Sequence, residues 1–201
     1  MPTFSRHGAI SVWLAVAMLV VGCSIGRDPQ RDPLPLDEER AYLAELLDTP
    51  PETIEGGRES VGPSAVNRTW TVLRPESTQH RSTVVTIHSR LAWYSPGDSP
   101  ASAFPPTGAQ DRHPGPLTRE GAVEAARALA RRAWLFDDPD GTVVGRILRE
   151  TDKSYEVELT LSSESPRVPG LVRVTLDPKT GLCWMVMATN WPGIPTTSQS
   201  P

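Results

Sequence analysis

The residues that could do metal or acid–base chemistry are few and widely spaced in this 201-residue chain. Beyond the N-terminal segment its histidines are His80, His88 and His113. None belongs to an H-E-x-x-H or C-x-x-C motif, so their spacing indicates no zinc site. The acidic run Asp137–Asp140 precedes Gly141, but Phe136 stands where a calcium loop needs its first ligand. We therefore expect no catalytic residue, metal or cofactor, and a hydrolase without a G-x-S-x-G motif is the alternative.

Cys23 is the residue whose surroundings do indicate a chemistry. Arg6 and His7 precede an apolar run, Ala9–Gly22, which is shorter than the roughly 20 residues that span a bilayer and has the order of a signal peptide. The run ends in Val-Val-Gly-Cys, which resembles the lipobox of bacterial lipoproteins. That resemblance implies cleavage after residues 1–22 and acylation of Cys23, whereas an ordinary signal peptide with a coincidental cysteine is the alternative.

A lipidated Cys23 would anchor the mature chain to a lipid bilayer of the cell envelope, facing the periplasm or the exterior. Ser24 resembles the residue that sorts such proteins to the outer membrane in a Gram-negative cell. Residues 23–36 contain several prolines among charged residues and are typical of a tether. The net charge of −4 argues against a nucleic-acid partner. Cys183 is then the only thiol left, and its apolar neighbours predict burial, with a reactive thiol as the alternative.

Residues 37–67 are expected to form a short helix and a loop. The helix covers Leu36–Asp48 with Asp37 as its N-cap, and the polar segment Glu52–Pro63 is assigned to the loop. An α+β domain is expected over residues 68–190. It begins with a strand at Trp70 and Val72 and a longer strand from Val85 to Tyr94, with His88 on the solvated face. Whether these strands join the sheet formed later in the chain is left open.

Leu117–Met187 has the pattern of one helix followed by four strands. Thr118 can cap the helix, whose apolar face consists of Ala122, Val123, Ala125, Ala126, Leu129, Ala130, Ala133 and Trp134. The expected strands are Thr142–Glu150, Ser154–Ser162, Leu171–Leu176 and Leu182–Ala188. Asp177–Gly181 has proline and glycine at positions that suit a tight turn between the last two.

This segment resembles the PepSY domain of bacterial envelope proteins. The resemblance rests on Leu117–Ala122 at the helix start, Tyr155–Val157 in a middle strand and Asp177–Gly181 in the last turn. It implies an α+β fold of the PepSY/cystatin-like kind, in which a helix packs on an antiparallel β-sheet. It also implies an association with protease propeptides, inhibition or other extracytoplasmic binding. Residues 191–201 are expected to be a disordered tail.

These features together predict a membrane-anchored envelope lipoprotein that acts as a non-catalytic binding or assembly module. Its expected partner is another envelope protein or a cell-wall component. Residues 95–116 contain six prolines and are interpreted as a binding loop or linker beside the sheet. The candidate contacts are Trp93, Tyr94 and Phe104, because aromatic anchors dominate binding energy. The alternative for all three is packing in the core, which is favoured more for Trp93 than for Tyr94 or Phe104.

Overall fold

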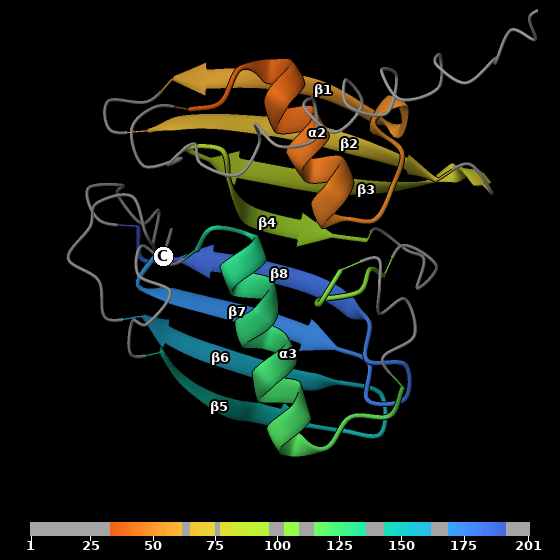
Figure 1. Ribbon diagram of the computed structural model, residues 1–201, viewed down its shortest axis with the longest axis vertical. Helices are drawn as coiled ribbons and strands as arrows, with labels where there is room; N and C mark the ends of the chain where they lie inside the picture. The colour runs from red at the N-terminus through yellow and green to blue at the C-terminus, as the bar shows by residue number, and fades with distance from the viewer. Residues whose placement is uncertain are drawn as a thin grey trace, which may run out of the picture.

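The computed structural model describes residues 33–61, 65–74, 77–96, 103–108, 115–135, 143–161 and 169–191. Cys23, the predicted signal peptide and the predicted tail beyond Trp191 lie outside these ranges. Within them the chain forms two helices and one eight-stranded antiparallel sheet, and both helices lie on the same face of the sheet (Figure 1). None of the helices in the described ranges is long and apolar enough to cross a membrane.

The same order of elements occurs twice along the chain. The first half consists of α2 (Leu36–Leu46), the short 3₁₀ helix η1 (Pro51–Thr53), β1 (Ile54–Val61), β2 (Val66–Arg74), β3 (Ser77–Ile87) and β4 (Arg90–Ser95). The second half consists of α3 (Arg119–Arg132), β5 (Val143–Glu150), β6 (Tyr155–Leu161), β7 (Leu171–Leu176) and β8 (Cys183–Thr189). Across the sheet the strand order is β1-β2-β3-β4-β8-β7-β6-β5, so the last strands of both halves meet at its centre. The early strands therefore join the later sheet, which answers the question that the sequence leaves open.

Helix α3 forms as the sequence predicts. The Thr118 hydroxyl accepts a hydrogen bond from the backbone N–H of Gly121 at 3.1 Å, which satisfies one of the unpaired donors of the first turn. Its buried residues are Ala122, Ala125, Ala126, Leu129 and Ala130, and the helix packs on β5, β6 and β7. Gly145 of β5 allows this close packing, because a Cβ atom there would lie 2.5 Å from Cγ1 of Val123.

Trp134 does not belong to the buried face of this helix, contrary to the prediction. The helix ends at Arg132, and Trp134 follows it with a left-handed backbone, φ 53°. Its ring stacks on Tyr42 of α2, with 3.9 Å between ring centroids and 11° between the ring planes. The Trp134 ring therefore connects the two helices, and its carbonyl oxygen accepts a hydrogen bond from the Arg90 guanidinium of β4 at 2.6 Å.

Helix α2 is fixed to its half of the sheet by a buried carboxylate, Glu39. One carboxylate oxygen accepts from the indole N–H of Trp70 at 3.0 Å and from the hydroxyl of Thr86. The other accepts from the Arg68 guanidinium and from the hydroxyl of Ser89 at 2.7 Å. Glu39 is completely buried, and four donors replace the water that a carboxylate would otherwise need. The predicted capping role of Asp37 is wrong, because this helix begins at Leu36 and no side chain caps it.

Two further predictions for the first half are wrong. The segment assigned to a loop over Glu52–Pro63 contains most of η1 and the edge strand β1, which pairs with β2 from Ile54 onward. The single long strand from Val85 to Tyr94 is two strands, β3 and β4, with a tight turn at His88 and Ser89. Both turn residues have positive φ, 50° and 61°. His88 therefore lies in a turn and not on the face of a strand.

Candidate binding face

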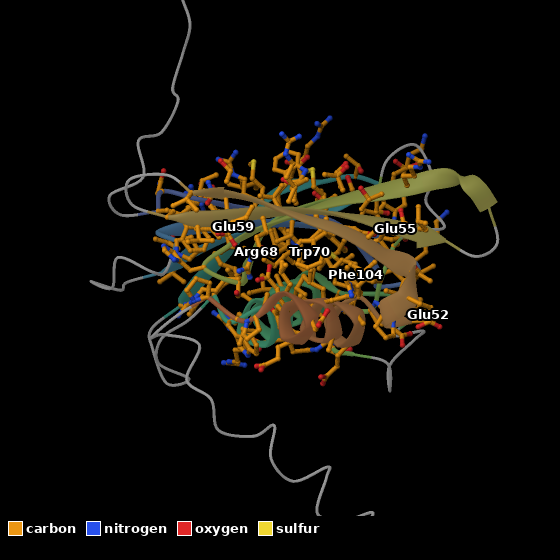
Figure 2. The ribbon with its side chains drawn as sticks, turned by 90° about the horizontal axis from the view of Figure 1, so that it is seen from above. Glu52, Glu55, Glu59, Arg68, Trp70 and Phe104 are labelled. Carbon is orange, nitrogen blue, oxygen red and sulfur yellow. The ribbon has the colours of Figure 1, made fainter. Side chains whose placement is uncertain are left out.

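The sheet presents one face to the helices and leaves its other face uncovered by any described element. Figure 2 shows α2 and α3 packed on one side, while side chains from the strands project from the opposite side. Successive residues of a strand point to opposite faces, and residues paired between strands share a face. The register of the eight strands therefore defines which residues line the open face.

One continuous row of paired residues crosses this open face from edge to edge. From β1 to β5 it consists of Arg58, Thr69, Val85, Trp93, Met187, Arg173, Glu158 and Arg146. We call these eight residues the central row. Its middle is apolar, and arginines lie toward both ends. Because the row includes one residue from each strand, both halves of the chain contribute to it.

Trp93 is the largest side chain at the middle of the central row. It lies between Val85 and Met187, which are its partners on β3 and β8. The tryptophan keeps 37% of its surface exposed. An indole that is neither packed in the core nor fully solvated can bury further apolar surface when another molecule covers it.

Glu158 holds two arginines of the row in place. Its Oε1 accepts from Nε of Arg146 at 2.9 Å, and its Oε2 accepts from Nε of Arg173 at 3.1 Å. These hydrogen bonds lower the pKa of Glu158, and the bond from Arg146 has the largest effect. Glu158 is therefore ionised at neutral pH. The carboxylate side chain is 3% exposed, whereas Arg146 and Arg173 keep 67% and 47% of their side chains exposed. Both guanidinium groups are therefore oriented by the protein and still accessible.

The open face carries more positive than negative side chains. Within the described ranges, strand register places five arginines there, namely Arg58, Arg81, Arg146, Arg149 and Arg173. The carboxylates on the same face are Glu55, Glu156 and Glu158. The whole chain has a net charge of −4. The five arginines and three carboxylates give this face of an otherwise acidic protein an excess of two positive charges, which favours negatively charged ligands.

The structure is similar to the Bacillus megaterium YpeB C-terminal domain, with a TM-score of 0.55 and 12% sequence identity, covering 85% of this chain and 70% of that one. The fold is PepSY-like. At 12% identity the likeness concerns the fold alone. No family model matches the sequence, and no curated protein matches it.

The three aromatic residues predicted as contacts lie in different places within this PepSY-like fold. Trp93 is partly exposed, so the alternative of core packing, which is favoured most for this residue by the sequence, does not hold for it. Tyr94 and Phe104 are completely buried and pack edge to face, with 4.8 Å between their ring centroids. Tyr94 follows Trp93 on β4 and therefore points to the helical face. Two buried rings cannot be contacts on the surface of the folded protein, so only Trp93 remains a candidate.

Phe104 also changes the interpretation of the proline-rich segment. Its backbone forms an isolated antiparallel bridge with Cys183 at the start of β8, with hydrogen bonds of 3.1 and 2.8 Å. Arg132 donates to the carbonyl oxygens of Pro105 and Pro106, each at 3.1 Å. This part of residues 95–116 is thus attached to the fold. Residues 97–102 and 109–114 lie outside the described ranges.

A cleft between the two helices is a second feature that sequence reasoning missed. It has a volume of about 240 Å³ and is lined by Tyr42, Glu45, Leu46, Arg132 and Trp134. The guanidinium of Arg132 donates there to the carbonyl oxygens of Glu45 and Leu46 at 3.1 and 3.2 Å. Together with its bonds to Pro105 and Pro106, these bonds make the Arg132 guanidinium a link between α3, α2 and the proline-rich segment. Its contacts are those of a structural residue.

The remaining reactive side chains do not assemble into a site in the part of the chain that the structure describes. No group of three histidine, cysteine, aspartate or glutamate side chains that could hold a metal occurs there. Cys183 is completely buried, as predicted, and burial raises the pKa of its thiol well above the usual range. A thiol in that state is a poor nucleophile.

Proposed function

We propose that this protein is a lipid-anchored binding module of the bacterial cell envelope, and that the open face of its sheet is the surface that binds another envelope component. The anchor would be the acylated Cys23 that the lipobox-like sequence predicts. The folded part would then be held near the membrane by the tether over residues 23–36. Its action would be association with a partner and not turnover of a substrate.

The observation that supports this proposal most is the position of Trp93. This large aromatic side chain is partly exposed, and strand register places it at the centre of the sheet face. No described element covers that face (Figure 2). Tryptophan is enriched among the residues that dominate binding energy, and such residues cluster near the centre of interfaces. Polar and charged residues surround it in the central row, in the manner of an interface rim.

The size of the face is adequate for a stable complex. Eight strands spaced about 4.8 Å apart give a width of roughly 34 Å. A typical partner buries about 800 Å² on each side of an interface. A rectangle of that area across the full width would need to extend only about 24 Å along the strands, which is the length of roughly seven residues.

The test is recovery of membrane partners with the intact lipoprotein and with Trp93→Ala. We expect the partners to be lost or strongly reduced with Trp93→Ala, because the change removes the central apolar contact without altering the core. Leu36→Ala is the matched control, since Leu36 is exposed to 45% and lies on helix α2. Equal recovery with all three proteins would refute the proposed face, and turnover of an envelope substrate by the purified protein would refute a purely binding role.

A further inference from the structure

The chemistry of the partner follows from the order of residues in the central row, an inference that rests on the proposed function. We infer that the open face binds a protein surface or segment in which an apolar side chain is flanked on both sides by carboxylates. The apolar side chain would cover Trp93 with Val85 and Met187. The carboxylates would meet Arg173 on one side and Arg58 on the other.

The spacing of the row sets the geometry of this partner. Arg173 lies two strands from Trp93, and Arg58 lies three strands from it on the opposite side. At about 4.8 Å per strand, the backbone positions of the two arginines lie about 10 Å and about 14 Å from Trp93. The partner's carboxylates would thus be separated by roughly 24 Å, with the apolar group between them.

The arginines suit carboxylates for a second reason. Arg173 and Arg146 are fixed by Glu158 on the sheet, so less side-chain entropy is lost when a ligand binds them. A guanidinium presents its donors as a planar fork that matches a carboxylate. Because Glu158 already neutralises one charge of this pair, the side of the row beyond Met187 retains one unit of positive charge.

The same arrangement argues against a polyanion, such as an anionic polymer or a surface of anionic lipid, as the main ligand. Polyanions bind best where cations are contiguous, since each added cation neutralises another charge of the polymer. In the central row the cations are separated by the apolar centre, and a buried carboxylate lies between two of them. A partner with an apolar centre and acidic flanks matches each part of the row.

The experiment selects ligands for the purified full chain from a displayed library of random peptides of about 12 residues, which is long enough to span the row at about 3.3 Å per residue. We expect the selected peptides to be acidic and to contain a large apolar residue. Their binding should weaken at least about 10-fold with Trp93→Ala and several-fold with Arg58→Glu or at high salt. Arg131→Glu, an equal charge change on helix α3, should have no effect. Circular dichroism would verify that each variant is folded.

Each other outcome overturns a defined part of this reasoning. If Trp93→Ala weakens the selected peptides but Arg58→Glu and salt do not, the acidic partner is wrong while the proposed binding face stands. Failure to enrich any peptide whose binding depends on Trp93 would overturn the inference, and the membrane recovery experiment would then decide the proposed face separately. Heparin and vesicles containing phosphatidylglycerol serve as polyanion probes. Tight binding of either one that is insensitive to Trp93→Ala would replace the protein partner by a polyanion.

Discussion

Removal of the Glu39 carboxylate should weaken the fold more than any other change to a single charged residue of helix α2. Its two oxygens receive four donors, from Arg68, Trp70, Thr86 and Ser89. Two of these donors, Arg68 and Ser89, also hydrogen-bond to the segment that precedes the helix. Arg68 also binds the carbonyl oxygen of Leu34 at 2.6 Å, and Ser89 accepts from the N–H of Leu34 at 2.7 Å. The carboxylate therefore connects α2 with strands β2 and β3 and with the turn at Ser89, and through Arg68 and Ser89 it also holds Leu34, which precedes the helix.

The magnitude follows from what Glu39→Ala leaves behind. Removing one partner of a buried ion pair costs about 3 to 5 kcal/mol, because the other charge stays buried without compensation. Arg68 keeps a second carboxylate, Glu59, at 3.0 Å, which places the expected loss near the lower end, about 3 kcal/mol. Since m is about 2 kcal/mol per molar urea for a domain of this size, the urea midpoint should fall by roughly 1.5 M.

The assay is urea unfolding of the purified protein followed by tryptophan fluorescence, which reports on Trp70 among other indoles. Glu38→Ala is the control, since it removes a neighbouring exposed carboxylate from the same helix. Glu39→Gln should be destabilised as well. In either orientation of the amide, its NH₂ group replaces an oxygen that accepts two hydrogen bonds, so two donors of the protein would face another donor. A midpoint for Glu39→Ala within 0.3 M of the control, on the order of 0.5 kcal/mol, would refute the structural role of this carboxylate.

Three further changes have defined outcomes. Phe104→Ala should cost about 3 to 5 kcal/mol, measured by the same unfolding, because its ring is completely buried against Tyr94; a neutral result would mean that the ring is exposed. Gly145→Ala should cost about 1 to 3 kcal/mol through its contact with Val123, and Val123→Ala should restore part of the loss in a double-mutant cycle; additive losses would contradict that contact. Glu158 has a lowered pKa, so its stabilising contribution is present above the unfolded pKa of about 4.3 and is lost as the pH falls further. The stability difference between the wild type and Glu158→Gln should therefore shrink below that pH, and a constant difference down to acid pH would exclude this coupling.

The second half of the fold could be predicted because its signals are local. Leu171–Leu176 has the same bounds in the prediction and in the structure. The Asp177–Gly181 turn is defined by its own residues, since the Asp177 carboxylate accepts from the N–H of Lys179 at 2.7 Å and Gly181 has φ 72°. Thr118 caps its helix from one turn away. Interactions over so few residues are visible in a sequence.

The first half depends on contacts between distant residues, which a sequence does not display. The turn at His88 and Ser89 lacks the glycine or asparagine that usually marks positive φ. It is stabilised instead by the hydrogen bonds of Ser89 to Glu39 and Leu34, which are 50 and 55 residues away. Strand β1 is polar and contains two glycines, and it forms because β2 supplies its hydrogen bonds. Local propensity had no means of indicating either feature.

The candidate site also depends on contacts between distant residues, because strand register decides which side chains face outward. Trp93 and Tyr94 are adjacent, so they point to opposite faces, and a shift of one residue in register would exchange them. That register depends on the turn at His88 and Ser89 and on the irregularity between Val85 and Thr86. Sequence reasoning could name both aromatic residues, but it could not assign either one to the open face. The central row is defined by the register of all eight strands, which the sequence alone could not predict.

The most direct test of the proposed binding face is site-specific photo-cross-linking in living cells that produce the protein. A photoreactive amino acid would replace Trp93 on the open face in one strain and Leu36 on helix α2 in another, with the chain otherwise intact. We expect a discrete cross-linked product at Trp93, reduced by Arg58→Glu, and none of that size at Leu36. The same product at both positions, or a product at Leu36 alone, would contradict the claim that the open face of the sheet binds the partner.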